Sequence, residues 1–180
     1  MFLIGDKTTG RHAGCDACPL APLQGLSMSD RRVGASGPLN APVAIIGLGP
    51  GLDEVRWGRP FIGRSGKKLD QLLDDASIKR SEVFVSNCAL CLPRPVPLAD
   101  GRVIPKAKTE RESVLKHCRQ RCLDELKLVR PRVVLAVGGL TTEALTDGVA
   151  GVTRIQGSLN PLSKLANHSA IVIPMFHPAH

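Results

Sequence analysis

Four short, mostly apolar runs separated by helical segments constrain the fold of this 180-residue chain more than any other feature. Buried strands are predicted at residues 43–47, 82–87, 132–138 and 169–174. Helices are predicted between them, at residues 66–77, 110–129 and 139–147. Continuous apolar strands that alternate with helices are typical of a parallel sheet covered on both faces. The sequence therefore predicts an α/β fold, a three-layer α/β/α domain with a central, mostly parallel four-stranded sheet.

The length corresponds to one domain that can bury its own core, so we expect residues 1–180 to form a single domain. Its first 41 residues have a loop-like composition. No apolar run reaches the roughly 18 residues of a membrane span, and the apolar start is too short for a secretion signal. We expect a cytoplasmic protein with no membrane contact.

The chain carries an excess of positive charge. It has 24 lysines and arginines against 16 aspartates and glutamates, a formal charge of +8. Such an excess on a small domain is expected of a protein that binds a polyanion. A solvated basic surface with no partner is the alternative.

Six cysteines in a chain without a secretion signal indicate metal or cluster ligation before disulfides. Cys15 and Cys18 form a C-x2-C pair, and four thiolates can hold either zinc or an iron–sulfur cluster. Some of the six can instead be core residues, because free cysteines are often buried. This alternative suits Cys88, at a strand end, and Cys122, one turn beyond Cys118 on the apolar face of a helix.

Distinctive residues follow the predicted strands. The loop GLGPG follows the first, Asn87 the second, Gly138–Gly139 the third and His177 the last. Ligands of such sheets bind beyond the carboxyl ends of the strands. The sequence thus predicts a binding site at this edge, although Asn87 can also cap a strand end and the glycines can simply form a turn.

Five motifs occur in one order along the chain: GCDACPLAP, GLGPGLDEVRWGRPFIGRSGKKLDQLL, VFVSNCALC, HCRQRCLDELKLVRPRVVLAVG and IPMFHPAH. Together they resemble the family 4 uracil-DNA glycosylases, the iron–sulfur members of the uracil-DNA glycosylase superfamily. The resemblance covers nearly the whole chain. It implies a 4Fe-4S cluster, structural or helping to place a DNA-binding loop, whose ligands are Cys15, Cys18, Cys91 and Cys118. Residues 1–41 would then be the cluster-binding segment.

The resemblance also assigns a base-binding site. Phe61 would stack on an extruded base, Asn87 would bind the Watson–Crick edge, and His177 would donate to a uracil carbonyl. Backbone N–H groups near the base would come from a loop of Gly47, Leu48, Gly49, Pro50 and Gly51. Phe61 as an ordinary core residue and His177 as a surface histidine are the alternatives.

The activity implied is hydrolysis of the N-glycosidic bond of uracil in DNA, which leaves an abasic site for base excision repair. A base must leave the stack to enter such a pocket. An asparagine amide offers one acceptor and one donor type, which matches the O4 and N3–H of uracil. A histidine donor stabilises the negative charge that develops on the leaving base. The implied protein is a monomer that binds single- or double-stranded DNA and releases uracil.

The sequence departs from the family pattern at three places. Leu48 and Val55 stand where the family usually has acidic residues, so Asp53 or Glu54 would have to assist the attacking water. Otherwise leaving-group stabilisation carries catalysis, or the protein is a weak or inactive DNA-binding relative. A glycosylase for a modified pyrimidine is a further alternative. The family also continues into a loop and helix after its last motif, whereas this sequence ends at His180.

The segment between Cys91 and Cys118 is longer than the family leads us to expect. Residues 92–109 are predicted to form a long loop. We expect the basic residues of this segment to contact phosphate, with a solvated loop as the alternative. They are Arg94, Arg102, Lys106, Lys108 and Arg111.

Overall fold

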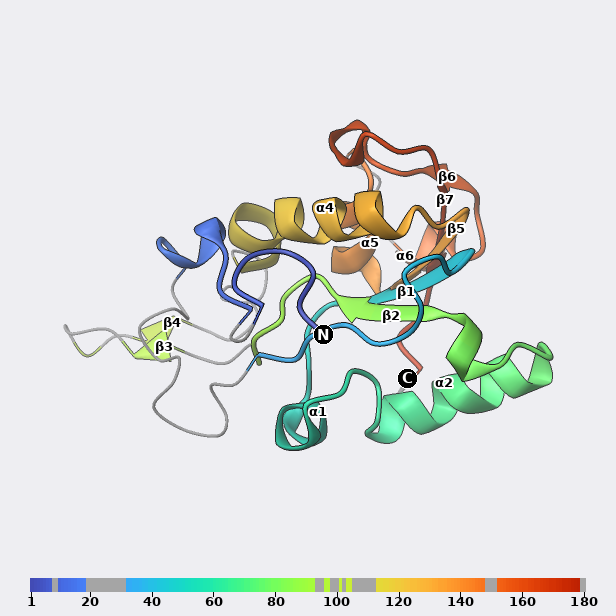
Figure 1. Ribbon diagram of the computed structural model, residues 1–180, viewed down its shortest axis with the longest axis horizontal. Helices are drawn as coiled ribbons and strands as arrows, with labels where there is room; N and C mark the ends of the chain where they lie inside the picture. Colours follow the sequence, from blue (N-terminus) through green and yellow to red (C-terminus); the bar gives the residue numbers. More distant parts are fainter. Residues whose placement is uncertain are drawn as a thin grey trace.

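The computed structural model describes residues 1–7, 10–18, 32–92, 96–97, 101, 103–104, 113–147 and 152–178. Its main sheet has the strand order β2-β1-β5-β7-β6 (Figure 1). The four parallel strands are β1 (Val43–Gly47), β2 (Phe84–Asn87), β5 (Val133–Val137) and β7 (Ile171–Met175). These are the four strands that the apolar runs predicted.

The prediction of a four-stranded sheet was one strand short. The fifth strand, β6 (Asn160–Pro161), pairs antiparallel with β7 at the edge of the sheet. Two residues, one of them a proline, carry no periodicity, and Asn-Pro is typical of a turn. The edge is also where a sheet tolerates proline.

Helices cover both faces of the sheet, as the predicted three layers require. In Figure 1, α1 (Leu52–Trp57) and α2 (Arg64–Asp75) lie below the sheet, while α4 (Arg119–Val129) and α5 (Gly139–Leu145) lie above it. Alternate side chains of β1 face the two layers: Ile46 packs with α4, and Ile45 packs with α2. The remaining helical segments are short: η1 (Ala13–Cys15), η4 (Arg80–Glu82), α6 (Val152–Ile155) and η6 (Lys164–Ala166).

Two predicted segments differ in detail. The helix expected over 110–129 begins, within the described residues, with a π-helical segment, η5 (Ser113–Cys118), that leads into α4. The segment 92–109, predicted as a loop, contains a small antiparallel pair of β3 (Val96–Pro97) and β4 (Val103–Ile104). A two-residue pair is too short to leave a period-2 pattern. The basic residues expected to contact phosphate lie outside the described residues: Arg94, Arg102, Lys106, Lys108 and Arg111.

The strand register brings the polar strand ends to one edge. Gly47 pairs with Asn87, and Val137 pairs with Met175. The amide of Gly138 also donates to the carbonyl of Met175, at 2.9 Å. Among the described residues, no helix has the length and apolarity that crossing a bilayer requires.

Candidate functional site

Gly47, Phe61 and Asn87 come together at the carboxyl edge of the sheet. A Cβ atom on Gly47 would lie 2.7 Å from Cζ of Phe61 and closer still to Oδ1 of Asn87. Both side chains therefore approach the backbone of Gly47 more closely than any other residue type would permit. This contact unites three of the predicted base-site residues.

Asn87 is an unusual buried polar residue. It is 2% exposed, yet within the described ranges its side-chain amide makes no hydrogen bond. Its amide atoms are not among the fully buried side-chain atoms that lack a partner in the described residues, so the amide keeps contact with solvent at the edge of the sheet. An amide held in this way is suited to a ligand that supplies both an acceptor and a donor.

A buried ion pair fixes the strand end that carries Asn87. The Arg121 guanidinium donates to the carbonyls of Asn87, at 2.5 Å, and Cys88, at 2.9 Å. It also lies 2.9 Å from the carboxylate of Glu125, which accepts a hydrogen bond of 2.6 Å from Ser86. Despite burial, Glu125 keeps the pKa of Arg121 above its usual value. This pair was not predicted; its one signal in the sequence is the i,i+4 spacing of Arg121 and Glu125.

Phe61 occupies a strained backbone conformation. It has a φ of 53°, which residues other than glycine rarely adopt, and its ring is buried among Ile45, Leu69 and Leu73. Two hydrogen bonds from Arg80 hold this segment: its guanidinium donates to the carbonyls of Pro60 and Phe61, at 3.1 and 3.4 Å. The ring position is therefore set before any ligand arrives.

Glu54 joins the glycine loop to the Phe61 segment. Its carboxylate accepts hydrogen bonds from the amides of Gly51, Ile62 and Gly63, at 3.0, 2.9 and 2.7 Å. Burial raises the pKa of Glu54, but these backbone bonds outweigh it and the net pKa lies below its usual value. A carboxylate engaged in this way is a weak base, so Glu54 positions the loop. The Gly51-x-x-Glu54 spacing of a capping box is the sequence signal for this role.

The other predicted loop residues contribute mainly backbone. The side chain of Leu48 packs against the core, and its carbonyl accepts a 2.8 Å hydrogen bond from the amide of Ala89. The neighbouring carbonyl of Gly47 accepts from the amide of Cys88, also at 2.8 Å. Gly49 and Pro50 complete the turn into α1.

His177 lies two residues beyond β7 and is half-buried. Two strands, β1 and β5, separate β7 from β2, so Ser86 and Pro174, which the register places level with each other, are about 14 Å apart at three strand spacings. His177 lies three residues beyond Pro174, past the same edge. His177 thus lies at the same edge of the sheet as Asn87, and its part in the base site stays a prediction.

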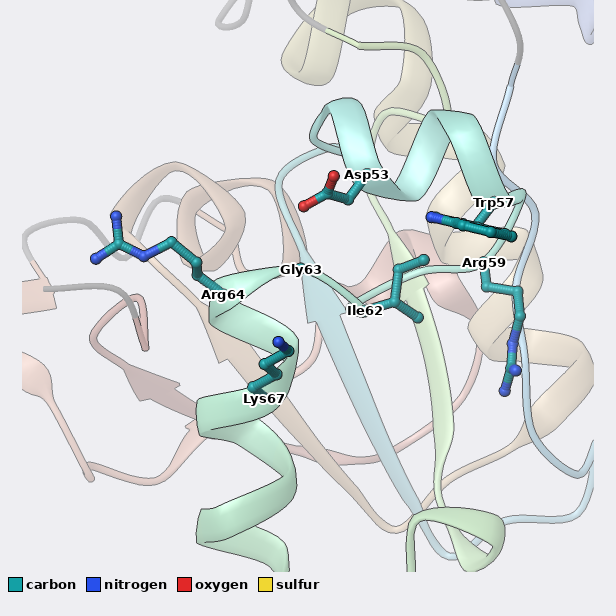
Figure 2. Close-up of a pocket in the computed structure, with 7 residues that line it drawn as sticks. All are labelled: Asp53, Trp57, Arg59, Ile62, Gly63, Arg64 and Lys67. Carbon is teal, nitrogen blue, oxygen red and sulfur yellow. The ribbon is translucent and has the colours of Figure 1, made fainter.

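Asp53 lies elsewhere. It lines a cavity of about 440 Å³ between α1 and the start of α2, together with the residues in Figure 2. Its Oδ2 lies 3.2 Å from where a Cβ of Gly63 would be. The structure therefore brings Gly47, Phe61 and Asn87 together but sets Asp53 in a separate cavity.

Four cysteines line a second cavity, between the N-terminal segment, the chain after β2 and η5. They are the four predicted ligands, Cys15, Cys18, Cys91 and Cys118. Burial raises the pKa of both Cys91 and Cys118 to about 12, and the neighbouring thiols add to the effect. Within the described ranges, no three Cys, His, Asp or Glu side chains are arranged to hold a metal ion.

Polar groups surround these thiols. Arg32 donates to Sγ of Cys15 at 3.5 Å, and Ser113 lies 3.6 Å from Sγ of Cys18. His12 lies 4.0 Å from Sγ of Cys118, and burial with nearby arginines lowers the pKa of His12 to about 4. None of these three residues was predicted, because none belongs to a motif of its own.

The two remaining cysteines belong to the core. Cys88 and Cys122 are fully buried in the cluster between the sheet and α4. Their mutual hydrogen bond, with burial, raises the pKa of the Cys88 thiol well above its usual value. The division into four cavity-lining cysteines and two core cysteines is the one that the sequence predicted.

These features define a three-layer α/β protein with a candidate ligand site at the carboxyl edge of its sheet and a thiol-lined cavity beside it. The family model of the Uracil DNA glycosylase superfamily matches residues 34–180. A "Type-4 uracil-DNA glycosylase" of Thermotoga maritima is 31% identical over 167 residues, which cover 92% of this chain and 77% of the relative. The chain therefore belongs to the uracil-DNA glycosylase superfamily, in its type-4 family, and the resemblance seen in the motifs is confirmed.

Two further relatives carry the same name. That of Pyrobaculum aerophilum is 27% identical over 74% of this chain, and that of Sulfurisphaera tokodaii is 24% identical over 77%. In both cases the match spans 60% of the relative's own length.

Proposed function

We propose that this protein is a DNA glycosylase that hydrolyses the N-glycosidic bond of uracil in DNA and leaves an abasic site. The observation that carries the proposal is the place of Asn87: the residue is 2% exposed, its amide makes no hydrogen bond among the described residues, and it lies against Gly47 at the edge of the sheet. Its acceptor and donor match N3–H and O4 of uracil, whereas cytosine reverses the pattern. The names of the relatives support the same activity.

Phe61 and the glycine loop would hold the extruded base. Stacking of a base on an aromatic ring contributes about 1–3 kcal/mol, and the preset position of Phe61 avoids a rearrangement on binding. The loop Gly47–Gly51, tied to the same segment by Glu54, would present backbone N–H groups to the base and its phosphate.

His177 would donate to O2 of uracil as negative charge develops on the departing ring. A single donor of this kind contributes about 10²–10³ to the rate. Because Leu48 packs on the core and Glu54 is engaged by amides, leaving-group stabilisation carries most of the catalysis. Asp53, the other acidic candidate, lines the cavity between α1 and α2, so we assign it no step in the reaction.

The four cavity-lining cysteines would hold a 4Fe-4S cluster. Four soft sulfur donors from three segments suit iron–sulfur ligation. The cluster supplies structural support when bound, because it joins the N-terminal segment, the chain after Asn87 and η5. Its measurable signs are a brown colour and stoichiometric iron and acid-labile sulfide.

The substrate is uracil-containing DNA, single- or double-stranded, bound by a monomer that releases uracil. The charge of +8 supports a DNA partner. A protein acting on DNA in this way works inside the cell.

A purified-protein assay tests the proposal. An oligonucleotide with one uracil should be cut after alkaline treatment, while the same oligonucleotide with thymine should stay intact. Asn87→Ala should abolish cutting but keep the far-UV spectrum of the folded protein. Cutting by this variant at the normal rate would show that the base binds elsewhere.

Leu48 favours one second candidate, a DNA-binding iron–sulfur protein without hydrolysis. The residue cannot accept a proton, and its partly buried side chain packs against the core. Retained binding with no cutting at stoichiometric protein would support this candidate over the glycosylase.

A further inference from the structure

We propose that the cavity between α1 and α2 is a second DNA subsite, which binds a nucleotide next to the extruded base. The base would stack on Trp57, and the phosphate would lie against Arg64 and Lys67 (Figure 2). This inference rests on the proposed function in one respect, namely that the bound strand is the DNA from which uracil is removed. Its main test uses DNA without uracil.

Trp57 is placed as a stacking platform. It is the only tryptophan of the chain and is 70% exposed at the end of α1. The next residue, Gly58, ends the helix in a left-handed conformation. Figure 2 shows the indole on the α1 side of the cavity, opposite Ile62 and close to Arg59. Exposed aromatic rings beside basic groups are the usual means of binding single-stranded DNA.

Positive charge lines the rest of the cavity. Arg59, Arg64 and Lys67 are exposed, and within the part of the chain that the structure describes they form no ion pair or hydrogen bond. Arg80, by contrast, is paired with Asp70 of α2 at 2.9 Å. The three lining cations are therefore available to a phosphate, the group that dominates the affinity of proteins for DNA.

The cavity also contains one carboxylate. Asp53 lies toward Gly63 and opposes the binding of an anion at that point. The phosphate is thereby directed to Arg64 and Lys67, in the first turn of α2. These cations add to the positive end of the helix dipole.

Size and position suit a single nucleotide. The volume of about 440 Å³ falls within the range of roughly 300–1,000 Å³ that is usual for small-ligand sites. Ile62 and Gly63 line the cavity and follow Phe61 directly in the chain. The proposed subsite thus adjoins the proposed base site, as the nucleotide next to an extruded base requires.

Because Trp57 is the sole tryptophan, its fluorescence reports directly on the subsite. A short single-stranded oligothymidylate should quench the emission, and the quenching should saturate together with binding measured by anisotropy. Complete binding with unchanged emission would overturn the proposal. The test does not depend on uracil excision.

Variants separate stacking from general charge. Trp57→Ala should weaken oligothymidylate binding about 5- to 100-fold, while Trp57→Phe keeps most of the affinity. Lys67→Glu should weaken binding and lower the salt slope by about 1, as for one lost phosphate contact. Lys68→Glu is the matched control, because it is exposed on the same helix but does not line the cavity. Equal effects of the two lysine variants would refute a local site.

Thymidine 5′-monophosphate distinguishes a strand subsite from a free-nucleotide site. It should quench Trp57 only at far higher concentration than the oligonucleotide, and equal potency would overturn the assignment to DNA. Uracil excision measured on the same preparations keeps the two proposals apart. Excision without a Trp57 response refutes the subsite alone, and a response without excision refutes the glycosylase alone.

Discussion

The buried pair of Arg121 and Glu125 should stabilise the fold and hold Asn87 in place, and substitution of Glu125 tests both effects. Replacing Glu125 with glutamine removes the negative charge but keeps the shape of the side chain. The Arg121 cation then stays at 1% exposure beside a neutral group, with the carbonyls of Asn87 and Cys88 as its acceptors. The substitution should lower the free energy of unfolding and displace Asn87.

The magnitude follows from the burial of the pair. Removing one partner of a buried ion pair costs about 3–5 kcal/mol. Glutamine can still accept the hydrogen bond of Ser86, so we expect the lower end, about 3 kcal/mol. For a chain of this length that corresponds to a fall in melting temperature of roughly 6–12 °C.

The assay is urea unfolding followed by circular dichroism, with a matched control at another ion pair. Arg80 and Asp70 lie at the same 2.9 Å distance, but their side chains are 29% and 51% exposed. Asp70→Asn should therefore cost less than about 1 kcal/mol. A double variant, R121M/E125M, should recover much of the stability, because buried pairs can often be replaced by apolar residues.

The double variant also separates stability from positioning. It lacks the bonds to the carbonyls of Asn87 and Cys88, so it should fold but excise uracil about 10-fold more slowly, which corresponds to about 1.4 kcal/mol. A loss below 1 kcal/mol in Glu125→Gln would refute the stability argument. Normal excision by the double variant would refute the positioning role.

Four further outcomes are expected. His177→Ala should lower the single-turnover excision rate by about 10²–10³, and a rate within a few-fold of normal would place the leaving-group donor elsewhere. Cys15→Ala should lose iron and sulfide while Cys88→Ala retains them, and metal analysis of the two purified variants checks the ligand assignment. Because the folded pKa of Glu54 is depressed, its stabilisation is fully present above the ordinary pKa of 4.5 and is lost as the pH falls through the lower folded pKa. Urea unfolding at several pH values across this range should therefore show that the free energy of unfolding falls more steeply with acid in the unaltered protein than in Glu54→Gln. Parallel curves would show that the Glu54 carboxylate does not hold the glycine loop. Leu48→Glu should raise the excision rate if an acid at this position can reach water, at some expense in stability because the leucine packs on the core; the two effects are measured by single-turnover kinetics and urea unfolding.

The parallel strands were predictable because both faces of the sheet are covered. A strand such as Val133–Val137 is apolar along its whole length and stands out without any alignment. β6 has two residues, and α1 has six with Val55 as its only buried member, so neither leaves a pattern. Short elements of this kind are held by tertiary contacts.

The candidate site was predictable where residue type and spacing carry the chemistry. The cysteine motifs and Asn87 at a strand end are examples of such signals. Arg121 and Glu125 were missed because sequence reasoning assigns charged residues to the solvent, and only the fold places this pair behind Asn87. Glu54 was considered as a base, but its three amide partners come from segments that the sequence cannot bring together.

The chain from Asn87 to Cys91 belongs to two sites at once. One end of this short segment carries the amide proposed to recognise uracil, and the other carries a thiol of the four-cysteine cavity. With the cluster held as proposed, base recognition depends on the supply of iron to the growing chain. A cell short of iron, or under oxidants that dismantle clusters, would then lose uracil repair through this protein without any change in how much of it is made.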